Sequence, residues 1–135
     1  MGEAGFVRFT LEEIRQQYGE STPRRQFLFR RLQTVTRLLS ETGSLRHLYL
    51  FGSFTTAKPI PGDVDCLAVM AAGFTTVNLP AHLLDVFQHD LCRLYDPAEV
   101  FWVAEIVGRE HIEAMLAVFS HDRQGTFPPI VEVTV

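Results

Sequence analysis

Short runs of apolar, β-branched and aromatic residues alternate with stretches of helical periodicity along this chain, and this alternation constrains its fold most strongly. Such runs predict strands over residues 45–51, 63–70, 99–107 and 130–135. An apolar strand face and an apolar helix stripe must both be buried, and they bury each other most readily. We therefore expect an α+β fold in which helices pack against one mixed β-sheet.

Helix boundaries are marked by capping signals. Thr10 and Glu13 have the spacing of a capping box, and Thr22 followed by Pro23 is a second helix start. Four helices are predicted: from Thr10 to near Gly19, from Thr22 to Gly43, from Pro80 to Asp96, and over residues 109–119. The predicted order of elements is αα-β-β-α-β-α-β.

Size and charge exclude several classes of protein. The 135 residues fit one domain with one core, covering residues 1–135. Lys and Arg number 12 against 16 Asp and Glu, for a net charge of −4, which argues against a protein that coats nucleic acid. The longest uncharged apolar run, residues 67–77, is far short of a membrane helix, and no secretory signal pattern is visible. We expect a cytoplasmic protein with no membrane partner.

The second predicted helix has a basic face. Its arginines outside the apolar positions are Arg24, Arg25, Arg30, Arg31 and Arg37. Such a face is either solvated or a strip that meets phosphate or an acidic partner. The sequence leaves both interpretations open.

Two acidic residues in the second predicted strand are candidates for chemistry. Asp63 and Asp65 are two apart, so their side chains leave one face with backbones ~6.6–7 Å apart. Two carboxylates at that distance can both reach a hard cation. Repulsion makes the pair costly without a cation or a proton. The alternative is that these residues cap the strand entry and form salt bridges with an Arg.

A Gly-Ser pair directly follows the first predicted strand. Gly52 allows a sharp turn and lets a ligand approach the main chain, and Ser53 adds a hydroxyl. The N–H groups of such a turn suit phosphate oxygens. An ordinary turn is the alternative interpretation of Ser53.

Together, Gly52-Ser53, the loop 54–62 and Asp63-Val64-Asp65 resemble the signature of the nucleotidyltransferase fold, the DNA polymerase beta superfamily. The spacing is one residue shorter than is usual there. Further segments look like a family of small bacterial nucleotidyltransferase-like proteins. They are Phe9-Thr10-Leu11-Glu12-Glu13, Gly52-Ser53-Phe54-Thr55-Thr56, Lys58-Pro59, Val100-Phe101-Trp102, Asp122-Arg123 with Gly125, and Ile130-Val131-Glu132. The resemblance implies that the chain is a single minimal domain of this type.

The resemblance also implies an activity: transfer of a nucleoside monophosphate from a nucleoside triphosphate, ATP among the candidates, to an unidentified acceptor. Asp63 and Asp65 would hold two Mg²⁺ ions with a third carboxylate. Glu99 matches that third position best. Glu105 has the same strand parity but lies ~20 Å further along the strand, so only one of the two can join the pair.

Phosphate contacts follow from the same resemblance. Gly52 and Ser53 would cradle the β- and γ-phosphates, and Lys58 would steer the triphosphate tail unless it is merely solvated. Nucleic acid enters only as a possible acceptor.

Two classes of function stay open. One is the enzyme just described. The alternative is a non-catalytic nucleotide-binding or antitoxin-like module of the same fold. Larger relatives carry a second domain for the acceptor. By analogy we expect a protein partner, such as the helical toxin of a toxin–antitoxin pair, or a second copy of the chain to complete that site.

Overall fold

The computed structural model describes residues 6–87, 98–120 and 130–135. The strands are β1 (Phe6–Phe9), β2 (Leu45–Phe51), β3 (Val64–Met70), β4 (Ala98–Ala104) and β5 (Ile130–Val133). The helices are α1 (Leu11–Tyr18), α2 (Pro23–Glu41), α3 (Ala81–Phe87) and α5 (Arg109–Ser120), with short 3₁₀ turns at Ser53–Thr55 and Glu105–Val107. Within these ranges, no helix is long and apolar enough to cross a membrane.

The strands form one mixed sheet in the order β1-β5-β2-β3-β4. The pairs β1–β5 and β3–β4 are parallel, whereas β5–β2 and β2–β3 are antiparallel. The predicted α+β class with helices packed on a mixed sheet is therefore confirmed.

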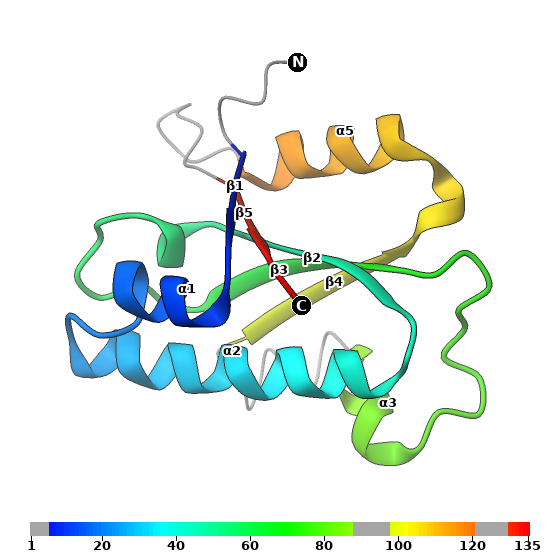
Figure 1. The fold of residues 1–135 in the computed structure, drawn as a ribbon, viewed down its shortest axis with the longest axis horizontal. Coiled ribbons are helices and arrows are strands. Elements are labelled where there is room, and N and C mark those ends of the chain that lie inside the picture. The colour runs from blue at the N-terminus through cyan, green and yellow to red at the C-terminus, as the bar shows by residue number, and fades with distance from the viewer. Residues whose placement is uncertain (1–5, 88–97, 121–129) are drawn as a thin grey trace.

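The sheet lies between helices on its two faces, as Figure 1 shows. Helices α1, α2 and α3 cover one face, where Leu28 of α2 and Cys66 of β3 belong to one buried cluster. Helix α5 lies on the other face, where Leu116 packs with Phe51 of β2 and Leu67 of β3. Both faces of β3 are therefore occupied by apolar contacts over much of its length.

The predicted helix starts are present. The Thr10 hydroxyl accepts from the Glu13 amide at 3.1 Å, and the Glu13 carboxylate accepts from the Thr10 amide at 2.9 Å. The Thr22 hydroxyl accepts from the Arg25 amide at 3.1 Å, with Pro23 at the first helical position. These bonds satisfy amide groups that a helix start otherwise leaves without a partner.

The predicted order of elements was wrong at its start, because it lacked β1. That strand has only four residues and takes its partner from the opposite end of the chain, pairing with β5. Strand β4 also ends at Ala104, before the predicted residue 107. Residues Glu105–Val107 instead form a 3₁₀ turn that closes at Gly108, whose φ of 94° favours glycine.

Other boundaries move by one or two residues: β3 begins at Val64, α5 ends at Ser120, and β5 ends at Val133. The predicted helix from Pro80 to Asp96 is described only as α3. Its remainder lies outside the described residues, as do Asp122-Arg123 and Gly125.

Candidate metal centre

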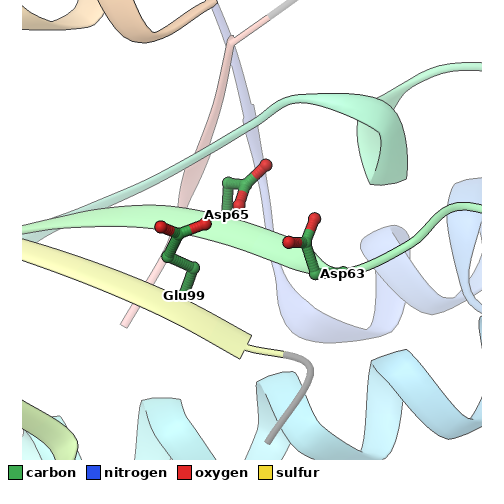
Figure 2. A group of neighbouring side chains, drawn as sticks. All are labelled: Asp63, Asp65 and Glu99. Carbon is green, nitrogen blue, oxygen red and sulfur yellow. The ribbon is translucent and has the colours of Figure 1, made fainter. Parts of the chain in front are cut away.

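Asp65 and Glu99 lie side by side because β3 and β4 are parallel neighbours whose register pairs these two residues. Each is the second residue of its strand. Asp63 lies one residue before β3. Figure 2 shows the three side chains gathered over the start of the two strands. Residues that are distant in sequence thus converge at one end of a strand pair.

The three carboxylates are close enough to share a cation. One carboxylate oxygen from each of Asp63, Asp65 and Glu99 lies within 4.8 Å of the other two. Two oxygens on opposite sides of a hard cation are about 4–5 Å apart, and carboxylates are the ligands that Mg²⁺ and Ca²⁺ prefer. The donor set and its spacing therefore fit a divalent cation.

The surroundings of Asp65 disfavour the negatively charged form of its carboxyl group. Burial, together with the negative charges of Asp63 and Glu99, raises the pKa of Asp65 to about 8. Among the described residues, the charged groups that raise the pKa of Asp65 are acidic. A carboxyl with this pKa holds its proton at neutral pH until a cation displaces it.

The three carboxylates occupy the face of the sheet on which α5 packs. Val64 and Cys66, on either side of Asp65 in the chain, are buried on the opposite face, as strand alternation predicts. Leu67, two residues after Asp65, packs with Leu116 of α5. The acidic group therefore lies directly beside the apolar contact between β3 and α5.

The turn after β2 is fitted to Asp65. Gly52 has a φ of 81°, and a Cβ atom placed on it would lie 2.4 Å from Asp65 Oδ2. The backbone conformation therefore favours glycine, and a Cβ here would displace the Asp65 carboxylate. Ser53 follows, half-buried, and its hydroxyl makes no hydrogen bond with another described residue. The predicted phosphate turn and the carboxylates are thus immediate neighbours.

Of the two candidates for the third carboxylate, the structure brings Glu99 to the pair. Glu105 lies in the 3₁₀ turn after β4, where its carboxylate is 3.8 Å from Arg46 Nε. Lys58 has an exposed side chain on the loop between Ser53 and Asp63, with no ion pair among the described residues.

The chain was also compared with known proteins. A family described as a family of unknown function, DUF6932, matches residues 2–134. The chain belongs to the DUF6932 family. No curated protein and no solved structure matches it. Since the matched region of this DUF6932 protein includes Gly52, Ser53 and the three carboxylates, the candidate site lies within the family domain.

Sequence reasoning missed the role of two arginines in this DUF6932 protein. Arg25 is only 3% exposed, so its prediction as part of a solvated or phosphate-binding face was wrong. It donates hydrogen bonds to backbone carbonyls of the loop before Asp63, as does the half-buried Arg24. A signal was present: Arg25 is three residues before Leu28 and so lies on the apolar stripe of α2. Arg30 is exposed, as predicted.

Proposed function

We propose that this DUF6932 protein is a metal-dependent nucleotidyltransferase, which transfers a nucleoside monophosphate from a nucleoside triphosphate to an acceptor hydroxyl. One observation carries the proposal: the carboxylates of Asp63, Asp65 and Glu99 converge beside the Gly52-Ser53 turn. A cation site next to a turn with close backbone approach suits a triphosphate, which needs both positive charge and hydrogen-bond donors.

In the proposed reaction, the acceptor oxygen forms a bond to the α-phosphorus, and the bond from that phosphorus to the pyrophosphate oxygen breaks. Divalent cations, Mg²⁺ in this proposal, would be held by the three carboxylates and would neutralise the phosphate charge. The backbone of Gly52 and the hydroxyl of Ser53 bind phosphate oxygens. The carboxylate of Glu99 takes the proton of the acceptor hydroxyl.

The same arrangement makes nucleotide binding depend on a cation. Without one, Asp65 keeps its proton, and the negative charges of Asp63 and Glu99 repel a triphosphate. The exposed Lys58 side chain is a source of positive charge on the connecting loop. We expect Lys58 to contribute to the attraction of the triphosphate tail and not to replace the cation.

The proposal is tested with the four labelled ribonucleoside triphosphates, Mg²⁺ and a cell extract that supplies acceptors, with transfer of label as the readout. The 135-residue chain is expected to transfer label, and Asp63→Asn is expected to abolish transfer. Asp85→Asn is the matched control, because it removes one carboxylate from the exposed surface of α3.

Two other outcomes decide between functions. No transfer from any nucleotide, with nucleotide binding that is indifferent to Asp63→Asn, would overturn the proposal. No transfer, with nucleotide binding that requires both Mg²⁺ and Asp63, would support the non-catalytic nucleotide-binding module instead.

A further inference from the structure

Arg25 carries a buried charge that is matched by backbone oxygens. Its guanidinium donates to the carbonyls of Tyr18 at 3.0 Å, Phe54 at 2.8 Å, and Thr56 and Lys58 at 2.6 Å each. It also lies 5.6 Å from the centre of the Phe54 ring. A buried charge is costly unless it is fully hydrogen-bonded, and charge-assisted bonds of this kind are strong. Three of the four acceptors belong to the loop that leads from Ser53 to Asp63.

The neighbours of Arg25 hold the rest of that loop. The Thr22 hydroxyl donates to the carbonyl of Pro59 at 3.2 Å. Arg24 Nε donates to the carbonyl of Pro61 at 3.1 Å, and its guanidinium also donates to the carbonyl of Gly62. The beginning of α2 therefore binds the loop from the residue after Ser53 to the residue before Asp63.

The three carboxylates are not placed by the same means. Asp65 and Glu99 are fixed by the ladder between β3 and β4. Asp63 precedes β3, and its backbone continues directly from the clamped loop. The position of Asp63 relative to the other two therefore depends on the contacts that α2 makes with residues 54–62.

We propose that Arg25 is a positioning residue, which through the loop 54–62 sets Asp63 against Asp65 and Glu99 and aligns the Gly52-Ser53 turn with them. Its effect on metal affinity rests on the proposed function. Its effect on the loop does not. A guanidinium suits this task because its planar fork of five donors serves several carbonyls at once, whereas a lysine ammonium offers three donors from one point.

The test is Arg25→Lys in the 135-residue chain, which keeps the positive charge and loses the planar fork of donors. In the metal-free protein, we expect the backbone amide NMR signals of the non-proline residues within 54–63 to shift or broaden, and those of β4 to stay unchanged. In a Mn²⁺ titration, we expect the dissociation constant to rise about 10–100-fold, as when residues that orient metal ligands are replaced.

Two controls separate positioning from general stability. Arg15→Lys changes a partly exposed arginine of α1 that pairs with Glu12 and Glu20, and it should leave both readouts unchanged. Leu39→Ala removes a fully buried side chain near the other end of α2. It should lower the melting temperature and leave the Mn²⁺ dissociation constant within about twofold.

Each possible result decides the role of Arg25 or the metal proposal. Unchanged amide signals for residues 54–63 in Arg25→Lys overturn the inference, as does unchanged Mn²⁺ affinity where the wild type binds. If the wild type binds no Mn²⁺, the metal proposal fails and the amide signals alone decide the role of Arg25. If Arg25→Lys does not fold, Arg24→Gln is measured in the same way, because it removes the contacts at the Asp63 end of the loop, together with the contact of the Arg24 guanidinium with the Phe27 ring.

Discussion

At the scale of single residues, the contact between Gly52 and Asp65 limits what the site tolerates. The glycine has a positive φ, and its missing side chain leaves room for Asp65 Oδ2. The carboxylate can therefore lie over the turn only while residue 52 has no Cβ. This contact ties the turn that would bind phosphate to the group that would bind the cation.

Replacement of Gly52 by alanine should disturb the site beyond the cost of its backbone conformation. A non-glycine residue in this region costs about 1–3 kcal/mol of stability, and the new Cβ also displaces Asp65. We expect Gly52→Ala to lower the free energy of unfolding, measured in urea, and to weaken Mn²⁺ binding at least tenfold.

The matched control for this substitution is Gly43→Ala. Gly43 has a similar φ of 74°, and nothing lies within 4 Å of the position that a Cβ atom would occupy there. Gly43→Ala should lower the free energy of unfolding by the cost of the backbone conformation alone and leave Mn²⁺ affinity unchanged. Equal Mn²⁺ affinity in the two variants would contradict the proposed contact between Gly52 and Asp65.

The pKa of Asp65 predicts how the stability of the metal-free protein depends on pH. Its pKa rises from 3.8 to about 8 on folding, so between these values the folded state holds the proton and the unfolded state does not. The contribution of Asp65 to the free energy of unfolding therefore falls as pH rises from about 4 to about 8, and is constant above that range.

Asp65→Asn removes the fall in stability that the titration of Asp65 causes. In urea denaturation with EDTA, the variant should gain stability relative to the wild type as pH rises through this range. Val118→Ala changes an exposed, non-titrating side chain of α5 and should run parallel to the wild type. A constant difference between Asp65→Asn and the wild type from about pH 4.5 to about pH 8.5 would show that Asp65 titrates normally.

Sequence spacing predicted the site residues with unequal success. Strand alternation indicated that Asp63 and Asp65 share a face, because their separation is local. The choice of Glu99 over Glu105 depended on a resemblance, since parity allows both and only the register of β3 with β4 separates them. The role of Arg25 depends on contacts with a loop about thirty residues away, which no local pattern encodes.

At the scale of elements, the sequence predicted the helices and strands that have a clear periodicity and clear boundary signals. Strand β2 was predicted with its observed bounds, and α1 and α2 begin at their predicted caps. Strand β1 was not predicted, because four residues carry little periodicity and its stability comes from pairing with β5. The change from β4 to a 3₁₀ turn was also missed, since residues Glu105–Val107 continue an apolar pattern.

Helix α5 is held on the sheet by its buried side chains. Leu116 is 1% exposed and packs with β3, whereas Val118 on the same helix is 72% exposed. Leu116→Ala should lower the free energy of unfolding by about 2–5 kcal/mol, because it leaves a cavity in a packed layer. Val118→Ala should change it by less than about 0.5 kcal/mol. Urea denaturation of the two variants measures both values, and similar losses would contradict the packing of α5 described above.

At the scale of the whole molecule, two different parts of the fold position the cluster of three carboxylates. The sheet fixes Asp65 and Glu99, and α2 holds the loop that ends at Asp63. The acidic residues are thus not spread evenly, because three of the 16 share one small region. A protein with this feature gains stability from any cation that binds its folded state alone.

The most direct test of the proposed metal centre is a Mn²⁺ titration of the 135-residue chain, followed by calorimetry or by the EPR signal of free Mn²⁺. We predict saturable binding that Mg²⁺ displaces, that Glu99→Gln weakens at least tenfold, and that Glu105→Gln leaves unchanged. The two variants make the same substitution six positions apart in the chain. Absence of binding by the wild type, or equal loss in the two variants, would contradict a metal centre formed by Asp63, Asp65 and Glu99.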